Sequence, residues 1–363
     1  MSRTRRRYVQ FWRDYIRANR DNWQLLLAEY ERIRHAWACL VALEGSTADR
    51  EQWILDYLLG LDTFLEQRGL YPQNIAWIER GIEAAKTQGR WQLTGRFYQD
   101  IGWCYRSLGD TQQAQQYLQT SLELRQKFGP PIGEAATLNM LGALYTDLNQ
   151  FELALDYLQR ALALRQETGH HEGEGITRHN IATIYTEQGK WLEAAEQYQA
   201  ALQIARDTDD KYSEAGTLNN LAEVDLVLGH TEQAEQLLRE ALALFVVAGD
   251  EVHQATALGN LGMLLKERGE IDEAMAMYEQ ALTIGRRFGR FAQLGTILNN
   301  MGLFMRVLVN TAVPLNTLKK PTSCTSKRGG LSIKPLPWLI LPKFTTNSVA
   351  TITPSATISV GGR

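Results

Sequence analysis

A unit of 40 residues recurs in unbroken register through the middle of the chain, and this period limits the possible folds more than any other feature. One column of the unit holds only small residues: Gly102, Gly142, Ala182, Ala222, Gly262 and Gly302. The residue before each of them is apolar: Ile101, Leu141, Ile181, Leu221, Leu261 and Met301. Because a small residue lets two backbones approach closely, the column predicts a helix contact that is repeated in every unit.

Two further columns contain residues that end helices. The first lies seven positions after the small column and reads Gly109, Asn149, Gly189, Gly229 and Gly269, with Gly69 at the same spacing upstream. The second reads Gly89, Gly129, Gly169, Asp209, Gly249 and Gly289. Glycine, asparagine and aspartate tolerate the left-handed backbone that closes a helix, so each unit is predicted to be a helix, a tight turn, a second helix and a longer turn.

The predicted second helix carries one stripe of alternating small and large residues. Its small positions are Ala114, Ala154, Ala194, Ala234 and Ala274, and four residues later come Leu118, Leu158, Tyr198, Leu238 and Tyr278. A single helical hairpin cannot bury such a face, whereas stacked hairpins bury it continuously. The sequence therefore predicts an all-α solenoid of antiparallel helix hairpins.

This pattern resembles the tetratricopeptide repeat (TPR) family, which forms superhelical solenoids. The resemblance is carried best by Leu141, Gly142, Tyr145, Asn149, Ala154, Leu158, Ala161 and Leu162. The 40-residue period is similar to the long-helix repeats of kinesin light chains and of bacterial regulators of the STAND or NB-ARC type. We expect an N-terminal helical segment (1–50), a divergent TPR-like hairpin (51–92), five full repeats with one unpaired helix (93–306) and a tail (307–363).

The two ends of the chain depart from the repeat. Residues 4–43 have the apolar spacing of an amphipathic helix, and 27–37 are similar to the segment that follows the nucleotide-binding module in bacterial signalling ATPases. From Leu303 to Arg363 there are eight Lys or Arg, six of the nine prolines, and no Asp or Glu. We expect residues 310–363 not to pack as a repeat. One explanation is a shifted reading frame or truncation, and the other is that these residues form a disordered basic tail.

Composition excludes several classes of protein. The formal net charge is −3, 44% of residues are hydrophobic, and no apolar run approaches the ~20 residues of a membrane span, so we expect a cytoplasmic protein without membrane contact. The three cysteines lie far apart in the sequence, at Cys39, Cys104 and Cys324, and lack the spacing of metal ligands. This spacing argues against a disulfide framework or a zinc site. The basic start of the chain lacks any nucleic-acid reading motif, so no nucleic-acid partner is predicted.

No catalytic motif stands out. Gly189-Lys190 lacks the rest of a phosphate-binding loop, and no nucleophile elbow is present. His170, His171 and His179 with Glu172 and Glu174 straddle a predicted inter-repeat turn without the i, i+4 pairing of a metal site. The sequence predicts neither an enzyme nor a bound cofactor.

Asparagines form the most informative polar columns. Asn180, Asn220, Asn260 and Asn300 immediately precede the apolar residue of the first helix, and Asn139, Asn219 and Asn299 lie one position earlier. Asparagine is a middling helix former, so its recurrence inside a helix needs a reason. In TPR domains that clamp peptides, asparagine at the first of these columns holds the peptide backbone, which the resemblance implies here. The alternative is a hydrogen bond to the backbone of a neighbouring repeat.

Other residues on the same predicted helix face qualify this expectation. The positions where a carboxylate clamp of the family carries basic residues read Arg106, Thr146, Thr186, Leu226, Lys266 and Arg306, so a continuous basic clamp is absent. Asp147, Glu187, Glu223 and Glu267 add acid, and Trp103 and Met263 add apolar contacts near the two ends of the array.

We therefore expect an interaction scaffold that binds a partner helix or extended peptide through Asn139, Asn180, Asn219, Asn220, Asn260, Asn299, Asn300, Trp103, Arg106, Glu223, Met263 and Lys266. The alternative is the sensor arm of a STAND-type signalling ATPase or transcription regulator, present as a fragment. An unpaired last helix would leave an apolar end, which predicts self-association.

Overall fold

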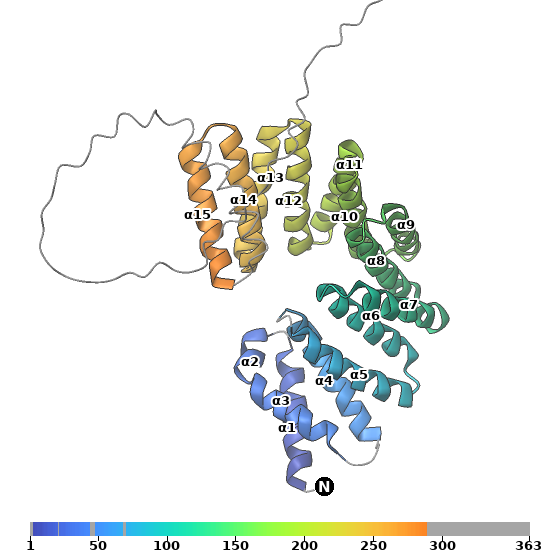
Figure 1. Ribbon diagram of the computed structural model, residues 1–363. Coiled ribbons are helices and arrows are strands. Elements are labelled where there is room, and N and C mark those ends of the chain that lie inside the picture. The colour runs from blue at the N-terminus through green and yellow to red at the C-terminus, as the bar shows by residue number, and fades with distance from the viewer. Residues whose placement is uncertain (1–2, 21, 44–47, 68–69, 289–363) are drawn as a thin grey trace, which may run out of the picture. The chain divides into compact units, whose positions relative to one another are not determined.

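The computed structural model describes residues 3–20, 22–43, 48–67 and 70–288, and every regular element among them is a helix. The helices are α1 (Arg3–Asn19), α2 (Trp23–Ala28), α3 (Tyr30–Val41), α4 (Ala48–Gln67), α5 (Tyr71–Thr87), α6 (Trp91–Ser107), α7 (Thr111–Phe128), α8 (Pro131–Asp147), α9 (Phe151–Glu167), α10 (His171–Glu187), α11 (Trp191–Asp207), α12 (Lys211–Leu228), α13 (Thr231–Ala248), α14 (Glu251–Glu267) and α15 (Ile271–Phe288). The predicted all-α solenoid of helix hairpins is confirmed (Figure 1).

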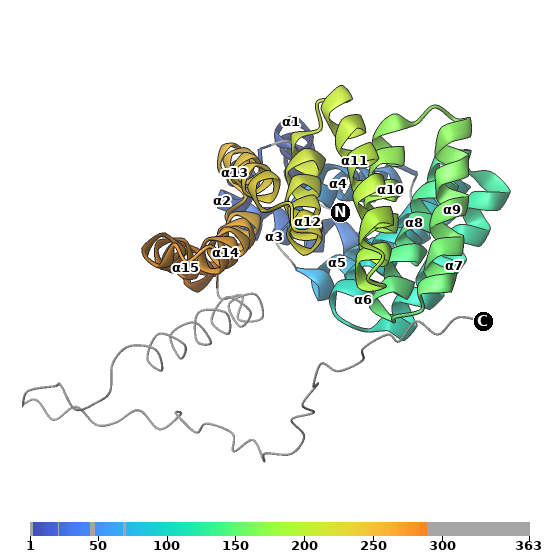
Figure 2. The same cartoon turned by 90° about the horizontal axis from the view of Figure 1, so that it is seen from above.

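From α6 onward the helices pack as five consecutive pairs. The pairs are α6 with α7, α8 with α9, α10 with α11, α12 with α13, and α14 with α15, and each second helix also packs against the first helix of the next pair. First helices of adjacent pairs touch one another as well, for example α10 with α12 and α12 with α14. Figure 2 shows the same succession of neighbouring helices from above. Below, α6, α8, α10, α12 and α14 are called first helices and their partners second helices.

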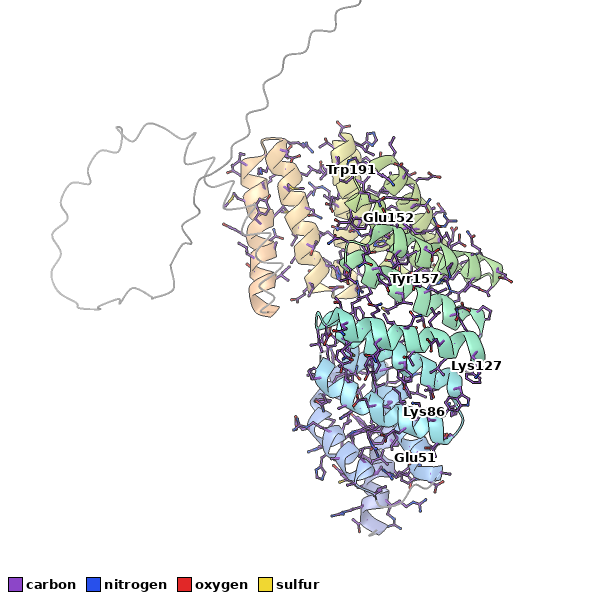
Figure 3. The ribbon with its side chains drawn as sticks, turned by 45° about the vertical axis from the view of Figure 1, so that its right-hand side comes forward. Glu51, Lys86, Lys127, Glu152, Tyr157 and Trp191 are labelled. Carbon is purple, nitrogen blue, oxygen red and sulfur yellow. The ribbon has the colours of Figure 1, made fainter. Side chains whose placement is uncertain are left out.

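The small-residue column brings the two helices of a pair together as predicted. A Cβ atom added to Gly142 of α8 would lie 2.5 Å from Cγ of Leu158 in α9, and one added to Gly102 of α6 would lie 2.6 Å from Cγ of Leu118 in α7. Aromatic residues strengthen the same contact, since Tyr157 (Figure 3) stacks on Tyr145 with ring centroids 5.4 Å apart.

The turn columns have the predicted backbone with one exception. Gly109, Asn149, Gly189, Gly229 and Gly269 all have positive φ, and in the second column Gly89, Gly169, Asp209 and Gly249 do too. Gly129 instead has φ −99° and ψ 163°. The cause is Pro130, because a residue before proline is restricted to extended conformations.

The N-terminal segment is not one continuous helix. The chain breaks after Asn19, and the side chain of Asn22 caps α2 by accepting a hydrogen bond from the backbone N–H of Leu25. A second break at Glu29 separates α2 from α3. The apolar spacing is compatible with both arrangements, since a short break keeps the apolar residues on the core side.

These first helices build their own apolar core against α4 and α5. Tyr57 of α4 is fully buried and donates a hydrogen bond of 2.9 Å to the backbone carbonyl of Val9 in α1. Trp37 of α3 stacks on Trp77 of α5 with centroids 4.6 Å apart. The array of repeats therefore continues from a packed helical cluster.

Several expectations lie outside the described residues. They are the turn glycines Gly69 and Gly289, the unpaired helix near 292–306 with Asn299, Asn300, Gly302 and Arg306, the tail 307–363, and the self-association expected from that end. Within the described residues, no helix combines the length and apolar character of a membrane span.

Candidate partner-binding site

Side-chain hydrogen bonds link the first helices of adjacent repeats. Asn180 of α10 donates from Nδ2 to Oδ1 of Asn139 in α8 at 3.1 Å, and Asn260 of α14 donates in the same way to Asn219 of α12 at 3.1 Å. In each case the acceptor lies 41 positions earlier in the chain. The two asparagine columns therefore form one ladder that crosses from repeat to repeat, and we call it the amide ladder.

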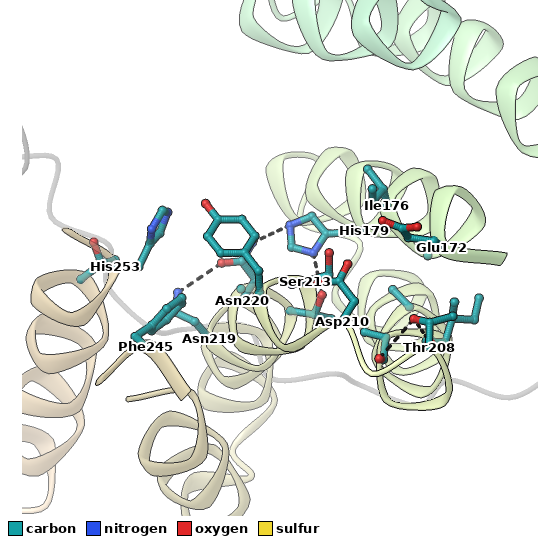
Figure 4. A pocket seen from close by; sticks show the side chains of 18 residues that line it. Glu172, Ile176, His179, Thr208, Asp210, Ser213, Asn219, Asn220, Phe245 and His253 are labelled. Carbon is teal, nitrogen blue, oxygen red and sulfur yellow. Dashed lines mark hydrogen bonds between the residues drawn. The ribbon is translucent and has the colours of Figure 1, made fainter. Parts of the chain in front are cut away.

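Histidine replaces asparagine at one rung of the amide ladder. Asn220 of α12 lies 3.2 Å from Nε2 of His179 in α10, and Nδ1 of His179 lies 2.9 Å from the hydroxyl of Thr217 (Figure 4). Asn219 also donates to Oδ1 of Asn220 at 3.2 Å. Because Asn220 offers its N–H group, Nε2 is the acceptor, and a neutral ring then carries its proton on Nδ1 and donates to Thr217.

Burial keeps His179 neutral. The packed helices around the ring withdraw water from it and lower its pKa to about 4. The ring also meets Tyr198 of α11 edge to face, with centroids 5.2 Å apart. Hydrogen bonds therefore run unbroken from Asn260 through Asn219, Asn220 and His179 to Thr217, across three first helices.

The sequence left two roles open for the asparagines. The alternative to peptide binding was a hydrogen bond to the backbone of a neighbouring repeat. The bonds do reach a neighbouring repeat, but their acceptors are side chains. Binding of a peptide by the same amides stays a prediction. His179 was not foreseen as a member of the ladder, although its position in the Asn139 and Asn219 column was a signal that could have revealed it.

A cavity of about 390 Å³ opens beside the ladder. Its lining includes His179, Asn219 and Asn220 from the ladder, and its other residues come from α10 to α14. Ile176 and Glu172 lie at one side of it, and Phe245 and His253 at the other (Figure 4). Ile204 and Ala205 add apolar surface, so the cavity joins an apolar wall to a row of hydrogen-bonding groups, as small ligand sites do.

Two carboxylates lie further along the same helices. Glu223 follows Asn220 by one turn on α12, and Glu187 lies on α10. Glu223 touches solvent, but the surrounding helices displace part of its water, which raises its pKa, and the charge of Glu187 raises it further. The two carboxylates therefore lie close enough for each to influence the other.

The remaining predicted site residues lie apart from this cavity. Arg106 lies over the ring of Trp103 and forms an ion pair with Asp147 of α8 at 2.6 Å, so its charge is already matched. Trp103 lines a second, smaller cavity of about 230 Å³ between α4, α5, α6 and α8. Helix α14, the first helix of the last described pair, carries Met263 and Lys266. The structure thus brings together Asn180 with Asn139, and Asn219 with Asn220 and Asn260.

The histidines considered as metal ligands have other partners. His170 caps α10 by accepting a hydrogen bond from the N–H of Gly173 at 3.0 Å, and His171 lies 3.9 Å from Glu174. Among the described residues, no group of three or more histidine, cysteine, aspartate or glutamate side chains is placed to hold a metal ion.

The paired helices, the left-handed turns and the small-residue contacts define an α-helical repeat protein. Models of the tetratricopeptide repeat match residues 95–128, 133–207 and 213–287, which together make up more than half of the chain. The chain belongs to the tetratricopeptide repeat family. No curated protein matches it.

Solved structures share this fold at low sequence identity. The apo form of RapI is 14% identical with a TM-score of 0.61, covering 78% of this chain and 99% of that one. A Rap protein complexed with Competence and Sporulation Factor is 15% identical with a TM-score of 0.57, covering 82% and 87%. BtubC (BKLC) from P. vanneervenii is 19% identical with a TM-score of 0.52, covering 71% and 99%.

Proposed function

We propose that this protein is a non-catalytic interaction module whose partner, an extended peptide or a helix, lies along the first helices α10, α12 and α14. The observation that carries the proposal is the cavity beside the amide ladder, which three successive first helices line with both apolar and hydrogen-bonding groups. A partner side chain can enter the cavity while its backbone meets the amides of Asn180, Asn220 and Asn260.

The ladder prepares this surface for binding. Its hydrogen bonds hold α10, α12 and α14 in a fixed relation before any partner arrives, so less conformational freedom is lost on association. Membership of the tetratricopeptide repeat family supports a protein partner. A Rap protein of the same fold has been crystallised with Competence and Sporulation Factor, which also fits a binding role.

Charge narrows the class of partner. Glu172 and Asp210 line the cavity, and Glu187 and Glu223 follow on α10 and α12. Such a face repels an acidic peptide and favours one with basic residues. A partner held by its terminal carboxylate is disfavoured, because the positions of a basic clamp on α10 and α12 hold Thr186 and Leu226, which carry no charge.

The test is selection of binders from a displayed library of random peptides, using the full chain, followed by affinity measurement with labelled peptides. Replacing Asn180, Asn220 and Asn260 together by alanine should weaken binding by at least about tenfold, since three amide contacts are lost. The matched control replaces Gln119, Gln159 and Gln199, which are exposed on the second helices α7, α9 and α11, and it should bind like the original chain.

Two results would contradict the proposal. One is a selection that enriches no peptide. The other is unchanged affinity in the triple asparagine variant while circular dichroism shows full helicity.

A further inference from the structure

The cavity lies where neighbouring repeats place a large, flat side chain. One column near the end of the second helices reads Arg125 in α7, Arg165 in α9, Ala205 in α11 and Phe245 in α13. The three large residues meet the first turn of the next first helix: Arg125 lies against Gly133, Arg165 against Gly173 and Phe245 against His253. Ala205 lines the cavity, so the space opens at the repeat that carries the smallest residue of these four.

Arg165 shows how a guanidinium fits this place. Its side chain is buried, with 7% of the residue exposed, and one terminal nitrogen donates to the backbone carbonyl of Gly173 and to the hydroxyl of Thr177. A Cβ added at Gly173 would lie 2.5 Å from Nδ1 of His170 and 2.8 Å from Nε of Arg165, so glycine leaves room for both side chains. A large arginine on the second helix is thus matched by the absence of a side chain on the first helix.

The following repeat fills the same place with an aromatic pair. Phe245 of α13 stacks on His253 of α14, with ring centroids 5.3 Å apart and an interplanar angle of 21°. In both kinds of repeat the residue on the second helix and its neighbour on the first helix fill the space together.

The repeat between them contains neither arrangement. Ala205 is paired with Ser213, and both are small. The wall is opened further by Gly216, where an added Cβ would meet no atom within 4 Å. The acceptors that Arg165 uses are nevertheless repeated, because Thr217 and the carbonyl of Ser213 stand 40 positions after Thr177 and Gly173, and both residues line the cavity. The Thr217 hydroxyl oxygen accepts from His179 and keeps a second lone pair for a further donor.

The charge of the lining fits a cation. Glu172 and Asp210 contribute carboxylates, and none of the described lining residues is lysine or arginine. Ile176 and Ile204 offer apolar surface for an aliphatic stem.

We propose that an arginine side chain of the bound partner occupies this cavity, in the place that Arg125 and Arg165 hold in the two preceding repeats. Its guanidinium takes the acceptors around Thr217 and Ser213 and is balanced by Glu172 and Asp210, and its stem packs against Ile176 and Ile204. This inference rests on the proposed function and adds to it the identity of one partner residue.

The test measures the binding of three blocked amino acids to the full chain by ligand-observed NMR titration. The probes are N-acetyl-arginine amide, the neutral isostere N-acetyl-citrulline amide, and N-acetyl-phenylalanine amide. The arginine probe should bind with a dissociation constant in the millimolar range. The affinity of the other two probes should be at least about fivefold lower, because only arginine carries the charge that the carboxylates balance.

Two variants assign the binding to the cavity. The double variant Ala205→Arg with Ser213→Gly copies the Arg165 and Gly173 pair, so it should remain folded, fill the cavity from within and abolish arginine binding. Gly216→Leu fills the cavity from α12 alone and serves if the double variant does not fold. Gln199→Ala, an exposed change on α11 away from the cavity lining, is the control that should still bind.

Each other outcome overturns the inference. Equal binding of citrulline, tighter binding of phenylalanine, binding that survives in the filled variants, or no binding of the arginine probe to the original chain would each do so. The proposed function is judged separately: if library-selected peptides bind the original chain and the double variant alike, the interaction module stands and the arginine site falls.

Discussion

Asn220 donates a hydrogen bond from Nδ2 to Nε2 of His179, 41 positions earlier in the chain, at 3.2 Å. The bond exists only while Nε2 carries no proton. Protonation would set two donors against each other and would break the run of bonds that joins α10, α12 and α14. The stability of this part of the array is therefore linked to the charge of one histidine.

The first prediction concerns pH. The pKa of His179 is about 4 in the folded chain, whereas an unfolded histidine has a pKa of about 6.5. Between these values the unfolded chain binds more protons, so the free energy of unfolding should fall as pH falls from 6.5 to 4, by up to about 3 kcal/mol. Urea unfolding at a series of pH values measures this loss.

The matched variant is His179→Asn, which copies the Asn139 and Asn219 rungs. It should keep the ladder and lie within about 1.5 kcal/mol of the original chain at pH 7. Depressed carboxylate pKa values at Glu174, Glu235 and Asp250 also remove stability at low pH, but equally in both proteins. Parallel stability curves for the two proteins between pH 6.5 and 4 would refute the role of His179.

The second prediction compares two glycines within first helices. Alanine is a better helix former than glycine by about 1 kcal/mol, so Gly216→Ala, where the added Cβ meets no atom within 4 Å, should stabilise the protein by roughly that amount. Gly142→Ala should instead destabilise it by about 1–3 kcal/mol, because the Cβ would lie 2.5 Å from Leu158. Denaturant midpoints of the two variants show whether each substitution raises or lowers the stability. A change in the same direction for both variants would contradict the close contact between Gly142 and Leu158.

The fold could be predicted from sequence because its determinants recur. Five repeats place a residue suited to positive φ at each tight turn, from Gly109 to Gly269, so the turns could be identified without knowledge of distant contacts. The exception at Gly129 follows from Pro130, which is also local. The breaks at Asn22 and Glu29 were missed, because a single N-terminal segment has no second copy with which to compare it.

The site was only partly predictable. The asparagine columns were visible, but their acceptors lie 41 positions away, and no local pattern reveals which side chain meets which. The cavity arises because the side chains at Ala205, Ser213 and Gly216 are small or absent. Small residues give no signal when taken singly, and they acquire meaning only beside Arg165 and Phe245 in the structure.

The third prediction concerns the N-terminal helices. The hydroxyl of Tyr57 is buried and donates to the carbonyl of Val9 at 2.9 Å, which ties α4 to α1. Tyr57→Phe should lower the free energy of unfolding by about 1–2 kcal/mol, because a buried carbonyl loses its side-chain donor while the ring remains packed. A change below the error of the urea transition would show that this bond contributes nothing.

The last prediction concerns the buried cation Arg165. No carboxylate causes a shift at this residue; burial alone lowers its pKa to about 10, so the protein holds its charge at a cost of roughly 3 kcal/mol. The groups it contacts also bond to each other, since Thr177 donates to the carbonyl of Gly173 at 3.1 Å.

Arg165→Met keeps the packing and removes the charge, so its stability should equal or exceed that of the original chain. Arg165→Ala leaves a cavity and should cost about 2–4 kcal/mol. Thermal and urea unfolding of both variants decide the point: a methionine variant as unstable as the alanine variant would mean that the guanidinium hydrogen bonds outweigh the cost of burying the charge.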